Sequence, residues 1–171
     1  MNRILPTIAL ACAAALALGA CGRTEQASPQ QAAAEQKPAV LPAPTNPADK
    51  SAWKQYLVNV VMANMQGVKS NHPYMYFVPA GDDDAAKADR GNQLENVKTV
   101  VARGVLPGNM MAFGGPDSKL TAQLVTDAFK DVRAGAFKDV IVLFIGAAAD
   151  VDGVKQALGT SGADVRFVEV K

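Results

Sequence analysis

Cysteine and histidine are nearly absent from this 171-residue chain. The two cysteines, Cys12 and Cys21, both lie near the N-terminus, and His72 is the single histidine. Beyond position 21 there is consequently no residue for a disulfide, a thiol nucleophile or a zinc-thiolate site. Any folded domain after Cys21 must be held together by its apolar core alone.

An excess of charge of either sign is also missing. The chain has 17 basic and 16 acidic residues, a formal net charge of +1, and removal of a leader containing Arg3 would leave the two signs balanced. Binding to nucleic acid or to an anionic membrane through a basic patch needs a surplus of Lys and Arg. The sequence therefore gives no electrostatic reason to expect a nucleic acid partner.

The common catalytic and nucleotide-binding motifs are missing as well. There is no Walker sequence, no dinucleotide-binding glycine pattern and no Gly-x-Ser-x-Gly elbow. His72 lies in the sequence Ser70-Asn71-His72-Pro73, which is typical of a turn and precedes the first predicted strand. A Ser-His-Asp site would have to be built on this turn, so we expect a binding function more than catalysis.

The N-terminus has the three parts of an export signal. Arg3 provides a positive charge, residues 4–18 form an apolar run, and small residues lead to Cys21. The run is too short to span a bilayer as a mature helix and polar sequence follows it, which favours a signal peptide over residues 1–20. The alternative is an ordinary cleaved secretory peptide in which the cysteine is incidental.

The sequence Leu18-Gly19-Ala20-Cys21 resembles the lipobox of bacterial lipoproteins. This resemblance covers only the first 22 residues, and we recognise no family for the rest. It implies cleavage before Cys21, a diacylglycerol on the Cys21 sulfur, and an acyl chain such as palmitate on the new N-terminus. Gly22 replaces the aspartate that usually retains such proteins, which implies anchoring in the outer membrane with the domain facing the periplasm.

Residues 21–49 have the composition of a disordered tether. They are rich in Ala, Gln and Pro and contain no aromatic residue, so they bury too little apolar surface to offset the entropy of ordering. As a flexible coil the tether would place its ends about 30 Å apart. A proline-rich recognition motif at residues 38–44 is the alternative.

Residues 50–171 are predicted to form a single α/β domain. An apolar helical pattern follows Asp49 or Ser51 as a possible cap, and short apolar segments then alternate with further helical patterns. The predicted strands are 74–79, 109–113, 140–145 and 165–170. This alternation predicts a three-layer sandwich with a mostly parallel four-stranded sheet. The most apolar segment, 140–145, should be central and the last strand should lie at an edge.

Polar residues and glycines follow three of these strands, at the edge where parallel sheets usually bind ligands. The candidate ligand-binding residues are Asp82, Asp83, Gly114, Gly115, Asp117, Ser118 and Asp150. If neighbouring strands bring the carboxylates together, they could hold a hard cation such as magnesium or calcium. The alternative is that Asp83 or Asp84, Asp117 and Ser118 cap helices. We assign no metal site, no cofactor and no catalytic residue.

The sequence therefore predicts an envelope lipoprotein whose domain is a binding or protein-interaction module. Its expected partners are the membrane, through lipidated Cys21, and an unidentified envelope protein. The alternative is an enzyme that acts on a small molecule or depends on a divalent cation, using the acidic loops.

Overall fold

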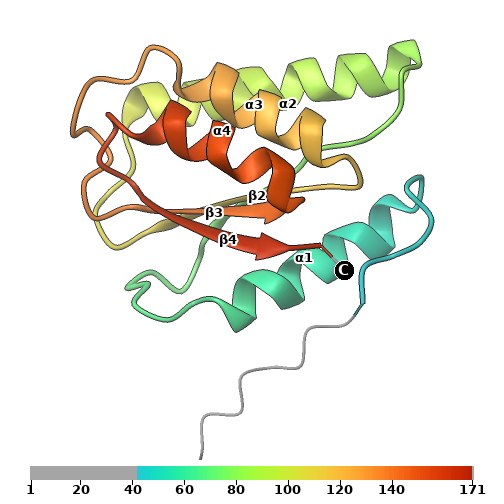
Figure 1. Cartoon of the computed structure of the whole chain (residues 1–171), viewed down its shortest axis with the longest axis horizontal. Coiled ribbons are helices and arrows are strands. Elements are labelled where there is room, and N and C mark those ends of the chain that lie inside the picture. The colour runs from blue at the N-terminus through green and yellow to red at the C-terminus, as the bar shows by residue number, and fades with distance from the viewer. Residues whose placement is uncertain (1–41, 171) are drawn as a thin grey trace, which may run out of the picture. The chain divides into compact units, whose positions relative to one another are not determined.

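A computed structural model describes residues 42–170 of the chain. Four helices and four strands alternate along it (Figure 1). In chain order they are α1 (Lys50–Ala63), β1 (Tyr74–Phe77), α2 (Asp84–Arg103), β2 (Met110–Gly114), α3 (Ser118–Phe129), β3 (Ile141–Gly146), α4 (Ala148–Leu158) and β4 (Asp164–Glu169). Each strand begins and ends within two residues of the predicted range.

The four strands form one sheet in the order β1-β2-β3-β4, and all neighbouring pairs are parallel. Pairing aligns Phe77 with Gly114, and Gly114 with Ile145. The predicted α/β sandwich with a parallel sheet is confirmed. Strand β3, which contains the most apolar segment, is central, and β4 is an edge strand, as expected.

Every connection from β1 to β4 moves one position in the same direction across the sheet. Because β-helix-β crossovers are right-handed, three such steps must place α2, α3 and α4 on the same face. Figure 1 shows these three helices on one face and α1 on the other. The order contains no reversal, so the described sheet lacks the switch point at which carboxyl-edge ligand crevices usually open.

The sheet is buried on both faces, which explains the unbroken apolar runs of its central strands. All residues of β2 and β3 are buried. Alternate side chains divide between two cores: Phe113 and Phe144 join the core under α2, α3 and α4, whereas Ala112 and Leu143 join the core under α1. Among the described helices, α1 is the one that covers this second face.

Helix starts follow from capping side chains. The Asp49 carboxylate accepts a hydrogen bond from the Ala52 N–H at 2.9 Å, so Asp49 is the cap of α1. Helix α2 begins at Asp84, ten residues before Leu94, which is its first large apolar residue. Its first half is mostly polar and exposed, so only its cap, Asp83, marks where it starts.

Residues 42–49, which precede α1, pack against the domain. The Trp53 indole N–H donates to the Asn46 carbonyl at 3.1 Å, and Ala43 packs against the core under α1. At the far end of α1, Arg166 of β4 donates to the carbonyl of Gln66 at 2.7 Å. These contacts fix both ends of α1 on the sheet.

Candidate functional site

An open groove runs along the free edge of β1. Within residues 42–170, strand β1 pairs with β2 and with no other strand, while α1 and α2 lie on its two faces (Figure 1). The groove has a volume of about 670 Å³. It is lined by Lys50 and Lys54 of α1, by Met75, Tyr76, Phe77 and Pro79 of β1 and its end, and by Asp89, Asn92, Gln93 and Asn96 of α2.

The floor of the groove is the main chain of β1. Val78 donates its N–H to the Gly114 carbonyl at 2.9 Å, so the polar groups of Val78 point toward β2. Main-chain groups alternate along a parallel strand, so those of Tyr76 also point toward β2. The N–H and C=O groups of Met75 and Phe77 then point the other way, into the groove. These groups form no hydrogen bond within residues 42–170.

The wall contributed by α2 is a polar stripe. Asp89, Asn92, Gln93 and Asn96 are spaced i, i+3, i+4 and i+7, which places them on one helix face. The apolar residues of α2, such as Val97, instead face the core. Three amide side chains, which both donate and accept hydrogen bonds, therefore line one side of the groove.

The wall contributed by α1 is basic. The Lys50 ammonium forms an ion pair with the Asp89 carboxylate at 2.7 Å, which bridges the two walls; both side chains are at least half exposed, so the pair is weak and can open to admit a ligand. The Lys54 ammonium lies 5.9 Å from the centre of the Phe77 ring, and no described carboxylate pairs with it. Lys54 is thus the uncompensated charge of the groove.

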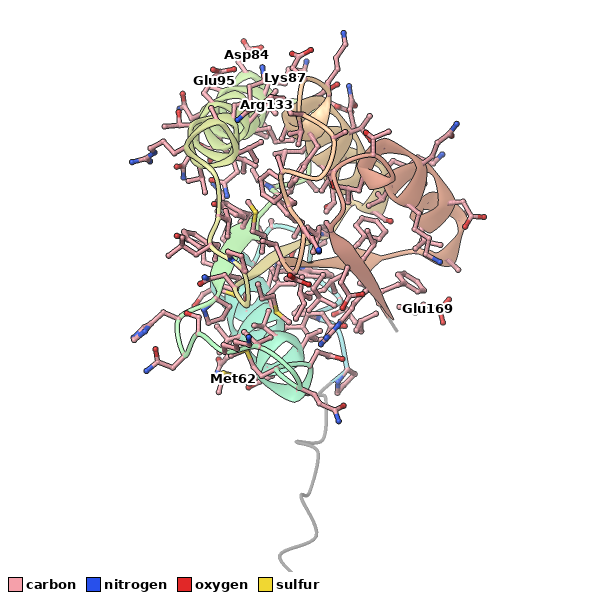
Figure 2. All side chains as sticks on the ribbon, turned by 90° about the vertical axis from the view of Figure 1, so that its left-hand side faces the viewer. Met62, Asp84, Lys87, Glu95, Arg133 and Glu169 are labelled. Atoms are coloured by element: carbon pink, nitrogen blue, oxygen red, sulfur yellow. The ribbon has the colours of Figure 1, made fainter. Side chains whose placement is uncertain are left out.

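Figure 2 gives a second view of the two faces. Met62 of α1 lies on one side of the sheet, and Asp84, Lys87 and Glu95 of α2 lie on the other. A segment entering the groove would therefore have α1 on one side and α2 on the other, with the β1 edge between them. The surrounding elements are held by core packing, so the groove does not depend on a flexible loop.

A second cavity, of about 440 Å³, lies between the ends of α2 and α3 and the segment that follows α3. Basic side chains of Lys98, Arg103 and Arg133 mix there with acidic Asp127 and Asp131. This mixture of signs favours no ligand charge, and no strand edge lines the cavity. It is a weaker candidate than the groove.

The predicted carboxyl-edge residues are largely engaged within the fold. Asp83 accepts from the Ala86 N–H at 2.9 Å, and Asp117 accepts from the Leu120 N–H at 3.0 Å. The Ala86 hydrogen bond, assisted by the Arg90 charge, holds the pKa of Asp83 below its ordinary value. Both side chains cap helices, which was the alternative to ligand binding at these two residues.

The glycines at this edge allow close packing. A Cβ on Gly115 would overlap the carbonyl oxygen of Val78, and a Cβ on Gly114 would overlap Leu57 of α1. The Ser118 hydroxyl accepts from the Ala147 N–H at 2.7 Å, which joins the loops after β2 and β3. Gly114, Gly115 and Ser118 are thereby placed by packing and hydrogen bonding.

Asp82 and Asp150 complete the predicted set. Neither carboxylate forms a hydrogen bond or an ion pair with another described residue. Within residues 42–170, no group of three or more His, Cys, Asp or Glu side chains is arranged to hold a metal ion. The described carboxylates of the set thus form no metal-binding group, and contact of the seven residues with a ligand stays a prediction.

Sequence reasoning missed the groove, although part of its signal was present. The polar stripe at positions 89, 92, 93 and 96 has helical spacing, but polar residues on one helix face usually indicate a solvated surface. The other part of the signal, which is that β1 is an edge strand between two helices, depends on strand order. That order became known only from the structure.

Comparison with known proteins adds no assignment: no protein-family model, no curated protein and no solved structure matches the chain. The described region contains no helix of the length and apolar character needed to cross a bilayer. Cys21, the predicted signal peptide and residues 21–41 of the predicted tether lie outside the described residues.

Proposed function

We propose that this chain is a lipoprotein of the bacterial outer membrane whose α/β domain binds a protein partner in the periplasm. The lipobox-like sequence ending at Cys21 and the Pro-rich segment after it support the anchored location. The observation that carries the binding role is the groove along β1, where a strand edge with no partner strand among the described residues lies between two polar helix walls.

Anchoring and binding support one another physically. A tether confines the domain to a thin layer next to the membrane and raises its effective concentration for partners in the envelope. A groove that uses a few main-chain hydrogen bonds and amide contacts has modest intrinsic affinity. Confinement compensates for that modest affinity.

The rival function is an enzyme that uses the acidic loops at the carboxyl ends of the strands. Asp83 and Asp117 already cap α2 and α3, and the strand order lacks the reversal that opens a ligand crevice. The balance of these observations favours binding at the β1 edge.

The location is tested by Cys21→Ser. Metabolic labelling with palmitate should be abolished in this variant, because the thioether and the processing that follows both need the cysteine. Labelling that persists in Cys21→Ser would contradict the proposed anchor. The unchanged wild-type chain, labelled in parallel, is the control.

The binding role is tested by photocrosslinking in intact cells. A photoreactive amino acid at Asn92, on the exposed wall of the groove, should give an adduct of defined mass. The same amino acid at Gln156, exposed on α4 and away from the groove, is the matched control. No adduct at Asn92, or equal adducts at both positions, would contradict the proposal.

A further inference from the structure

The sheet has two edges, and the edge formed by β1 lines the 670 Å³ groove. Along β1 the main-chain groups of Met75 and Phe77 repeat every second residue, with one N–H and one C=O each. These groups have the spacing that an added strand needs for main-chain hydrogen bonds.

We propose that the groove binds an extended segment of the partner protein as a fifth strand beside β1. This inference rests on the proposed binding function and specifies how binding occurs. Main-chain hydrogen bonds to Met75 and Phe77 supply affinity, and the two helix walls select side chains, as in other cases of strand addition.

The size of the groove fits this occupant. A strand residue advances about 3.3 Å, lies about 4.8 Å from the neighbouring strand and occupies a layer about 10 Å thick, which is about 160 Å³ per residue. Four residues would fill about 640 Å³, close to the groove volume of about 670 Å³. Strand β1 is also four residues long.

The walls define the chemistry of the segment. Its side chains would alternate between α1 and α2. Toward α1 they meet Lys54, whose ammonium has no carboxylate partner in the described chain, so a carboxylate there would compensate the charge. Toward α2 they meet the amides of Asn92 and Asn96, which favour polar side chains. The ligand is thus an extended segment with an acidic residue on one face and polar residues on the other.

Two other occupants fit less well. The chain's own segment before α1 is interrupted by Pro29, Pro38, Pro42, Pro44 and Pro47, and proline cannot donate to a ladder. A second copy paired edge to edge would bring the basic α1 wall of one chain next to the basic α1 wall of the other, without a carboxylate to compensate Lys54.

The test uses heptapeptides selected from a random displayed library against the full chain in detergent. A selected peptide is then resynthesised with a single N-methyl group at each position in turn. If it binds as a strand, N-methylation at every second position should weaken binding at least about ten-fold, because those N–H groups face β1. The intervening positions should change little. Loss at no position, or loss without a two-residue period, would overturn the inference.

A matched pair of protein variants gives an independent readout. Phe77→Ala and Phe77→Pro both remove the aromatic ring, but only proline removes the N–H that faces the groove. Because that N–H does not bond to β2, both variants should retain the wild-type circular dichroism spectrum. The peptide should bind the proline variant at least about ten-fold more weakly than the alanine variant. Equal binding to the two would contradict strand addition.

The outcomes separate the inference from the proposed function. An adduct at Asn92 in cells, together with N-methylation effects that show no two-residue period, would contradict strand addition but support the binding role. A dimer of the full chain that dissociates in Phe77→Pro, measured by sedimentation, would assign the edge to a second copy and overturn the proposed partner segment. Failure to select any peptide sensitive to Phe77→Pro would overturn it as well.

Discussion

Replacing Tyr76 by Phe should stabilise the domain. The Tyr76 ring is 5% exposed and stacks on Phe113 with ring centres 5.0 Å apart. Its hydroxyl is buried and has no hydrogen-bond partner among the described residues. Phenylalanine keeps the stacking and removes a hydroxyl that loses its water on folding.

The magnitude follows from the cost of burying an unpaired hydroxyl. That cost is about 1–3 kcal/mol, so we expect the variant to gain about 1 kcal/mol, or about 4 °C in Tm for a domain of this size. Burial, followed by the charge of Tyr74, raises the pKa of Tyr76 from 10.0 to about 12, against a lowering effect of Arg103. The folded state thus keeps the proton at pH values at which the unfolded state releases it.

A raised pKa contributes stability that is fully present below pH 10 and is lost as the pH rises toward about 12. Two pKa units correspond to about 2.7 kcal/mol in total, and about half of this is lost by pH 11. The advantage of Tyr76→Phe over wild type should therefore grow by about 1.4 kcal/mol between pH 8 and pH 11.

Urea unfolding of both proteins at pH 8 and pH 11 measures these differences, because titration of the other residues is common to both chains. A Tyr76→Phe variant destabilised by about 1 kcal/mol would show that the hydroxyl has a partner in solution. A difference that does not change with pH would show that the hydroxyl ionises equally in both states. Either result would refute the reasoning.

Three further outcomes test the account of the carboxyl edge. Gly115→Ala should destabilise the domain by more than about 3 kcal/mol in thermal melts, because its Cβ would overlap the main chain of Val78. The control is Gly91→Ala, which has open space around it and should stabilise the domain by about 0.8 kcal/mol. Asp117→Ala should cost about 1 kcal/mol through loss of the cap on Leu120, and Asp117→Asn, which can still cap, should cost much less. Magnesium or calcium should not shift the wild-type melting temperature; a shift lost in both Asp117 variants would favour the enzyme hypothesis.

The pattern of elements was predictable because it depends on local sequence. Segments such as 140–145, with six apolar residues in a row, indicate a strand covered on both faces, and their alternation with helical patterns favours a parallel sheet between helices. The caps at Asp49 and Asp83 were likewise visible as acidic residues before a helical segment. The exposed residues in the polar first half of α2 have no apolar period, so only the cap, Asp83 or Asp84, predicted where this helix starts.

The site depended on information that a single sequence does not contain. Neighbouring strands bring the loops of Asp82, Asp117 and Asp150 to one edge of the sheet, but a single sequence does not show that Asp117 turns back to cap α3, nor that the strand order lacks the reversal at which ligand crevices usually open. The groove depends on the same order, since β1 offers Met75 and Phe77 to a ligand only as an edge strand. Local patterns predict elements, but the position of each strand in the sheet decides which surface is open.

Amide hydrogen exchange along β1 in the intact chain tests the central claim most directly. The N–H groups of Tyr76 and Val78 bond to β2, whereas those of Met75 and Phe77 face the groove. We predict that the amides of Met75 and Phe77 exchange on the order of 100-fold faster than those of Tyr76 and Val78 in the free protein. Their exchange should become slower when a selected peptide is added. Equal protection of all four amides in the free protein would mean that the β1 edge is already paired, and would contradict an open binding edge.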